Sequence, residues 1–236
     1  MTLPACLVAI VLLIDASGSV PDPLYAAQRD GPASAFEDPR LIRTLERSDG
    51  IAVLLADFDA QARTRVPWTL IRTRDDAAAF ATAVRAIRRT GRSGVTAVGR
   101  ALAHANAVLA EAPCTPANRM VDISTDGIET DSRLPAPFMR DAAADAGTVI
   151  NAIAFLDPAL AASPEFGADE ILAESEAWLR DHVATGFVRI ARGAQGFEES
   201  FRAKVIVEVT SLEPPIPDRP SPPTGGRGLD EGGAAP

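Results

Sequence analysis

Apolar runs alternate with amphipathic stretches along most of the chain. The first run, Leu7–Ile14, is apolar at every position, which is typical of a strand buried on both faces. The predicted strands are Leu7–Ile14, Ile51–Phe58, Arg63–Trp68, Met120–Ser124, Thr148–Phe155 and Phe187–Ala191. The predicted helices are Pro21–Phe36, Asp75–Arg89, Val95–Ala112, Pro137–Ala146, Asp169–His182 and Phe197–Glu208. This alternation predicts an α/β fold, with a mostly parallel sheet and helices on both of its faces.

Proline and glycine mark the expected interruptions. Gly31-Pro32 predicts a kink or a break in the first helix, since proline cannot donate the backbone hydrogen bond of a helix interior. The last 25 residues, from Leu212 to Pro236, contain seven prolines and five glycines. Such a segment cannot bury a core. We therefore expect one domain over residues 1–211 and a disordered tail over residues 212–236.

Composition narrows the possible functions. The 236 residues are enough for one large domain, and a net charge of −9 disfavours binding to nucleic acid. Lys204 is the only lysine, so the chain has no phosphate-binding Walker lysine. The two histidines, His104 and His182, are too few for a histidine-rich zinc site and make a Ser-His-Asp triad hard to build. No apolar run reaches the roughly 18 residues that a membrane-spanning helix needs.

Oxygen-bearing side chains stand where predicted strands end. Asp15, Ser17 and Ser19 directly follow the first strand. Asp126 follows the fourth major strand, and Thr96 stands at the start of a helix. In an open parallel sheet, ligands bind at the carboxyl ends of the strands. Hard oxygen ligands of this kind suit Mg²⁺ or Mn²⁺, and a site rich in hydroxyl groups makes Ca²⁺ the less favoured ion.

The order and spacing of these residues resemble the von Willebrand factor type A family. The metal-ion-dependent adhesion site of that family is Asp-x-Ser-x-Ser, then a Thr three residues before a Gly, then Asp-Gly after an apolar strand. Five residues match this pattern: Asp15, Ser17, Ser19, Thr96 and Asp126. The resemblance implies a Rossmann-like, doubly wound sheet in the order 3-2-1-4-5-6, with strand 3 as an antiparallel edge. It also implies a non-enzymatic binding module whose metal accepts an Asp or Glu carboxylate from a partner protein.

Within that family, the chain is most similar to a bacterial group of exported proteins. The shared segments are Ala27-Gln28-Arg29-Asp30-Gly31, Val66-Pro67-Trp68-Thr69 and Asp122-Ile123-Ser124-x-Asp126-Gly127. This resemblance implies a periplasmic or otherwise exported protein. No basic residue precedes Arg29, and no signal peptide is visible. A cytoplasmic location is therefore the alternative.

The strand order of the resemblance also brings the two cysteines together. Cys6 begins the first strand and Cys114 precedes the fourth, so both fall at the amino-terminal end of neighbouring parallel strands. Neighbouring strands lie about 4.8 Å apart, and the Cα atoms of a disulfide lie roughly 4.4–6.8 Å apart. We expect a Cys6–Cys114 disulfide, and two small buried thiols are the alternative.

Three other interpretations of the metal motif stay open at this stage. Ser17 and Ser19 are also suitable caps for the following helix, and Asp126 for the next turn. A second alternative is a metal-dependent hydrolase or phosphatase. Ser17 argues against it, because a haloacid-dehalogenase-type site needs Asp at this position. A third is a metal-free interaction domain that binds through its loops or its proline-rich tail.

Two further sets of charged residues have ordinary interpretations. Arg85, Arg88, Arg89 and Arg92 are predicted to form a solvated helix end rather than a binding patch. Asp131, in the loop after the fourth major strand, is either a carboxylate that orients metal-bound water or a surface acid.

Overall fold

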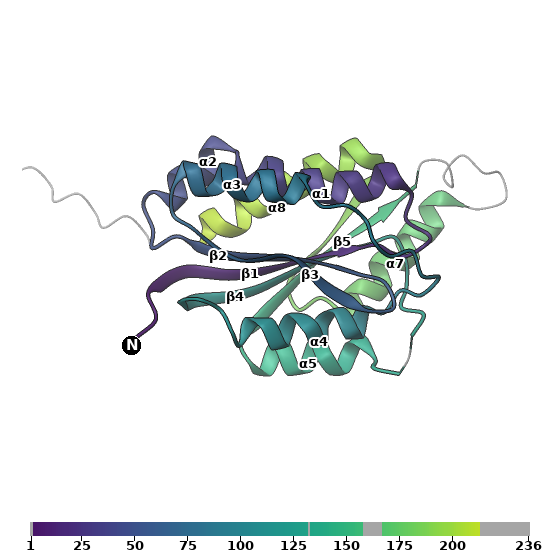
Figure 1. Cartoon of the computed structure of the whole chain (residues 1–236). Coiled ribbons are helices and arrows are strands. Elements are labelled where there is room, and N and C mark those ends of the chain that lie inside the picture. The colour runs from purple at the N-terminus through teal and green to yellow at the C-terminus, as the bar shows by residue number, and fades with distance from the viewer. Residues whose placement is uncertain (1, 132, 158–166, 213–236) are drawn as a thin grey trace, which may run out of the picture.

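The computed structural model describes residues 2–131, 133–157 and 167–212 (Figure 1). Six strands form one sheet in the order β3-β2-β1-β4-β5-β6, with β3 antiparallel to β2 and the other described pairs parallel. They are β1 (Ala5–Asp15), β2 (Ile51–Phe58), β3 (Ala62–Ile71), β4 (Thr115–Thr125), β5 (Thr148–Leu156) and β6 (Val188–Arg192). The predicted strand order and antiparallel edge are confirmed. The predicted tail lies, from residue 213 onward, outside the described residues.

Helices cover both faces of the sheet, as a doubly wound fold requires (Figure 1). One face carries α1 (Asp22–Phe36), α2 (Pro39–Leu45), α3 (Arg74–Arg85) and α8 (Gly193–Ser211). The other carries α4 (Val98–Leu109), α5 (Ala136–Asp145) and α7 (Ala168–His182). Within the described ranges, no helix is both long enough and apolar enough to cross a membrane.

The central strand β1 contributes to two hydrophobic cores. Every residue from Cys6 to Asp15 is buried, and alternate side chains of a strand point to opposite faces. Ile10 and Leu12 pack in the core that contains α1 and α8, whereas Val11 and Leu13 pack in the core that contains α4 and α5. A strand that must fill two cores is apolar at consecutive positions, which explains why its sequence predicts it well.

The break predicted at Gly31-Pro32 is wrong, because α1 continues through Pro32 to Phe36. Gly31 lies so close to α8 that a Cβ there would be 3.3 Å from the Cβ of Phe201 and 3.5 Å from the Cα of Glu198. Pro32 is itself buried. Packing of α1 against the sheet and against α8 therefore maintains a helix across a proline that would interrupt an isolated one.

A disulfide joins Cys6 to Cys114, and their Cα atoms are 5.8 Å apart. Because Ala5 pairs with Thr115 in the sheet, this bond connects the amino-terminal ends of β1 and β4. The carboxyl ends of the same two strands lie at the opposite end of the sheet, where Ile14 pairs with Ser124. The disulfide and the predicted metal ligands therefore lie at opposite ends of β1 and β4.

The segment between α3 and α4 is longer than the pattern predicts. α3 ends at Arg85 rather than at Arg89, and α4 begins at Val98 rather than at Val95. Residues 86–97 are irregular in consequence. This irregular segment contains both Arg89 and Thr96, and it lies at the carboxyl edge of the sheet.

Candidate metal site

The ends of β1 and β4 place two polar side chains in contact. Ile14 pairs with Ser124, so Asp15 stands beside Thr125. The Thr125 hydroxyl donates a hydrogen bond of 2.6 Å to Asp15 Oδ2, and the Ser17 backbone N–H donates one of 2.7 Å to Asp15 Oδ1. Asp15 and Thr125 are both fully buried. Asp15 is thus a buried carboxylate whose two oxygens are held by its neighbours.

A chain of hydroxyl and carboxylate oxygens leads from Asp15 across to β4. The Ser17 and Ser19 Oγ atoms are 3.1 Å apart, and the Ser19 hydroxyl donates to Asp126 Oδ1 at 3.1 Å. Four of the five predicted ligand residues therefore lie in one hydrogen-bonded network: Asp15, Ser17, Ser19 and Asp126. Asp126 lies more than 100 positions from the other three residues in the sequence, and the register of β1 on β4 brings it to them.

Thr96, the fifth predicted ligand, reaches this edge by a different route. Its N–H donates to Thr130 Oγ1 at 2.9 Å, and its carbonyl accepts from the Thr130 N–H at 2.9 Å. The segment that carries Thr96 also contacts the first loop, since the Gly18 N–H donates to the Ser93 carbonyl at 2.7 Å. Three separate stretches of chain thus meet here, with Thr96 bound to the loop after β4.

The two carboxylates at this edge affect each other. Burial raises the pKa of Asp15. Burial and the nearby charge of Asp15 raise the pKa of Asp126 to about 7. Two acids that share a poorly solvated site resist carrying two negative charges at once. A cation between them would relieve this repulsion.

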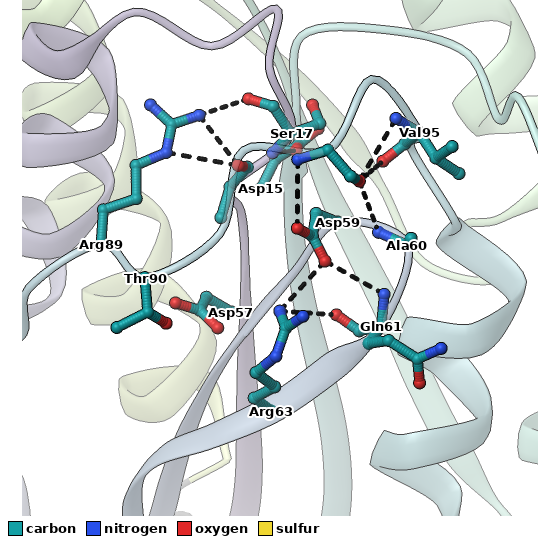
Figure 2. Close-up of polar contacts among 12 residues, drawn as sticks. Asp15, Ser17, Asp57, Asp59, Ala60, Gln61, Arg63, Arg89, Thr90 and Val95 are labelled. Carbon is teal, nitrogen blue, oxygen red and sulfur yellow. Dashed lines mark hydrogen bonds and ion pairs between the residues drawn. The ribbon is translucent and has the colours of Figure 1, made fainter.

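The prediction that Arg89 belongs to a solvated helix end is wrong. Its side chain is only 7% exposed, and its guanidinium turns back onto the loop after β1 (Figure 2). Nη2 and Nε donate to the Ala16 carbonyl at 2.8 and 3.2 Å, Nη1 donates to the Val20 carbonyl at 2.7 Å, and Nη2 also donates to the Ser17 carbonyl. Arg89 therefore fixes the backbone that carries Ser17 and Ser19.

Asp59 anchors the irregular segment on the other side (Figure 2). This buried carboxylate accepts from the Ser93 N–H at 3.3 Å and from Arg63 Nη1 at 3.0 Å. Its backbone carbonyl accepts from the Ala97 N–H at 3.0 Å. A Cβ at Gly91 would lie 2.5 Å from Asp59 Oδ2, so a larger residue there would displace this carboxylate. The turn after β2 therefore holds the residues on either side of Thr96.

Gln28 and Glu129 are positioning residues that the ligand motif does not include. Fully buried Gln28 accepts from the Asp15 N–H at 2.9 Å and donates to the Asp15 carbonyl at 2.9 Å. It also accepts from the Ser124 hydroxyl at 2.6 Å, so it connects the ends of β1 and β4. Glu129 accepts from the backbone N–H groups of Gly99 and Ala136, which start α4 and α5. Gln28 lies in a segment that the resemblance already singles out, whereas no sequence signal marks Glu129.

Asp131 is not a free acid at the surface, and its partners are arginines rather than the candidate metal ligands. Its side chain is buried, and it pairs with Arg100 at 3.0 Å and with Arg133 at 2.8 Å. These contacts, above all the hydrogen bonds from Arg133, hold the pKa of Asp131 at about 2. Asp131 therefore secures the loop after β4 as a charged residue.

The donor set fits a hard divalent cation. Two carboxylates balance a charge of +2, and serine and threonine supply neutral oxygens, the ligand types that Mg²⁺ and Mn²⁺ prefer. Among the described residues, no group of three or more His, Cys, Asp or Glu side chains is suited to a metal. The candidate site is consistent with that finding, because it contains only two such residues and depends on hydroxyl groups for the rest.

The strand order and the similarity to solved structures show a von Willebrand factor type A fold. Within that class, the chain belongs to the family described as "Protein of unknown function (DUF1194)", whose model matches residues 5–213. A search of curated proteins finds no match.

Solved structures share the fold at low sequence identity. Proximal thread matrix protein 1 (PTMP1) from the mussel byssus, crystal form 2, has a TM-score of 0.63 and 16% identity over 89% of this chain and 49% of that one. The pilus adhesin SpaC from Lactobacillus rhamnosus GG, open conformation, has a TM-score of 0.62 and 16% identity over 88% of this chain and 30% of that one. A von Willebrand factor type A protein from Catenulispora acidiphila has a TM-score of 0.53 and 23% identity over 86% of this chain and 43% of that one. This chain spans less than half the length of each of these proteins.

Proposed function

We propose that this protein is a divalent-metal-dependent module for binding another protein. The observation that carries the proposal is the oxygen network at the ends of β1 and β4, which joins Asp15, Ser17, Ser19 and Asp126. These four residues, with Thr96 from the neighbouring segment, would hold Mg²⁺ or Mn²⁺, and Ca²⁺ less well. When bound, the metal supplies a positive centre that accepts a carboxylate from outside the chain.

The charges around the network support a cation there. Asp15 and Asp126 are both acidic and poorly solvated. Arg89, the basic residue that acts on both, directs its hydrogen bonds to backbone carbonyls rather than to these carboxylates. The negative charge of the pair is therefore left for an ion of higher charge.

The partner that suits such a site presents an Asp or Glu side chain. One structure of the mussel protein has a zinc-occupied metal-ion-dependent adhesion site (MIDAS) motif, and it is similar to this chain with a TM-score of 0.58 and 15% identity. That mussel protein is a thread matrix protein, and SpaC is a pilus adhesin. From these two neighbours we infer an exported location, in the periplasm or beyond it, and a binding role rather than catalysis.

Metal titration tests the proposal. Mg²⁺ should raise the midpoint of thermal unfolding of the wild type, and a ligand at 100 times its Kd adds about 2.7 kcal/mol. Asp126→Ala and Ser19→Ala should lose this stabilisation. Asp75→Ala, at an exposed acid in the first turn of α3, is the matched control and should keep it. Equal stabilisation of all four proteins by Mg²⁺ would show that the metal does not bind at this end of the sheet.

Capture of partners separates binding from catalysis. Immobilised protein should retain a partner in Mg²⁺ and release it into chelator, and Asp126→Ala should retain nothing in either buffer. Phosphatase and esterase substrates are assayed in parallel. Metal-dependent turnover that Asp126→Ala abolishes would show that the protein is a hydrolase rather than a binding module.

A further inference from the structure

A second cluster of ionisable residues lies inside the molecule, on the side of the sheet that α8 covers (Figure 1). Asp122 is in the middle of β4, beside Asn151 of β5. Lys204 and Glu208 stand one turn apart on α8. Lys204 is the only lysine of the chain, and it is fully buried. A side chain that is charged and flexible is rarely found in such a place without a specific partner.

The three ionisable side chains of this cluster lie in contact. Lys204 Nζ forms an ion pair with Asp122 Oδ1 and another, at 2.8 Å, with Glu208 Oε1. Asn151 Nδ2 donates to Glu208 Oε1 at 2.6 Å, which fixes that carboxyl group. The Lys204 nitrogen is therefore in direct contact with the Asp122 carboxylate.

The surroundings of this contact are apolar. Nζ lies 5.6 Å from the ring centroid of Phe187 and 5.9 Å from that of Phe201. Asp122 and Glu208 are 3% and 5% exposed. Removing an ion from water costs several kcal/mol, so a charged group in a dry site needs a partner in direct contact. Burial and the charge of Asp122 raise the pKa of Glu208 to about 8, which leaves it as a proton donor at neutral pH.

We propose that Lys204 and Asp122 condense spontaneously into an isopeptide bond, with Glu208 as the proton shuttle. The amine nitrogen and the carboxyl group are already in contact, and the carboxyl group of Glu208 reaches that nitrogen at 2.8–3.0 Å. The product is an amide between the central strand β4 and the last helix α8. This inference does not depend on the metal site.

The reaction balances without any other reagent. A proton passes from the Lys204 ammonium to the Asp122 carboxylate, which gives a neutral amine and a neutral carboxylic acid. The lone pair of Nζ attacks Asp122 Cγ, so that a C–N bond forms. Glu208 donates a proton to the departing hydroxyl group and takes one back from the nitrogen. The Cγ–O bond breaks, one water leaves, and Glu208 returns to its starting form.

The fold supplies the driving force that dilute solution lacks. Groups held together in a fixed geometry react with effective concentrations of about 10⁵–10⁸ M. The bond also removes a buried ion pair, whose desolvation is costly. The cross-link would keep α8 attached to the sheet when the rest of the chain is pulled or heated.

Mass spectrometry of the full chain tests the proposal. With the disulfide reduced, the wild type should be about 18 Da lighter than its sequence, the mass of one water. Glu208→Gln and Lys204→Arg should have the full mass of their sequences. After tryptic digestion, the peptide that contains Asp122 should be joined to the peptide that contains Lys204.

The single lysine provides a second measurement that does not need the variants to fold. In denaturant, an amine-reactive reagent labels the α-amine and any free ε-amine, and Lys204 is the only source of the latter. The wild type should take up one label if the bond is present and two if the lysine is free. A wild type of full mass that takes two labels would overturn the proposal, as would a loss of water that maps to another residue.

Discussion

Replacing Arg89 with Met is expected to lower the free energy of unfolding by about 3.5–4 kcal/mol. Arg89 is nearly buried, and it donates to the carbonyls of Ala16 and Val20 at 2.7–3.2 Å. Its guanidinium also lies 5.1 Å from the ring centroid of Tyr25. Methionine retains most of the aliphatic packing but cannot donate, so the substitution isolates the loss of these polar contacts.

The expected magnitude follows from these contacts. A hydrogen bond from a charged donor contributes about 1.5–3 kcal/mol. Because the loop lies near the surface and water can reach part of it, we take about 1 kcal/mol for each of the three carbonyls, those of Ala16, Ser17 and Val20. The contact with the tyrosine ring adds about 0.5–1 kcal/mol.

The assay is equilibrium unfolding in urea, with Arg85→Met as the matched control. Arg85 pairs with Glu37 at the surface, and the two side chains are 40% and 43% exposed. Exposed pairs of this kind contribute about 0–1 kcal/mol, so the control should change little. Equal losses in the two variants would show that Arg89 is an ordinary solvated arginine and would refute the reasoning.

Three more predictions concern the loop after β4. Gly99→Ala should destabilise the fold by about 2–3 kcal/mol in urea unfolding, because the new Cβ would lie 1.8 Å from the Leu134 carbonyl oxygen; an unchanged midpoint would contradict this close approach. Glu129→Gln should cost about 1 kcal/mol and Glu129→Ala about 2 kcal/mol, because glutamine keeps one acceptor for the two helix starts and alanine keeps none; equal stabilities would count against the double cap. Asp131 has a pKa of about 2 in the folded protein, held down above all by Arg133, against the ordinary value of 3.8. Its stabilising contribution is therefore complete above pH 3.8 and is lost as the pH falls through 2. Denaturant unfolding should find Asp131→Asn less stable than the wild type by a constant margin from pH 8 to pH 4, and a margin that shrinks already near pH 6 would argue against the ion pairs.

The strands were predictable because their burial leaves a direct trace in the sequence. β1 must fill a core on each face, so consecutive residues are apolar and no helical period competes with the assignment. The helix α2 left no comparable trace, since its seven residues, Pro39–Leu45, are too few for a clear period. α1 misled the prediction, because Pro32 is tolerated only where the sheet and α8 support the helix.

The grouping of three candidate ligands at one strand end was predictable for a related reason. Asp15, Ser17 and Ser19 are close in sequence, and their spacing alone directs oxygens to one strand end. The residues that position them were not predictable in this way. Arg89 belongs by sequence to a run of arginines, and only its backbone path, beyond the end of α3, turns it onto the carbonyls of the first loop. Glu129 acquires its role only because α4 and α5 begin side by side.

By itself, then, the sequence determined the layered α/β class, the order of elements and the residue types of the candidate site. Those properties depend on local periodicity and on spacings of a few residues. Only the tertiary structure decided which distant side chains meet, such as Asp126 with Ser19 and Lys204 with Asp122. These contacts depend on strand register and helix packing, where a shift of one residue turns a side chain to the other face of the sheet.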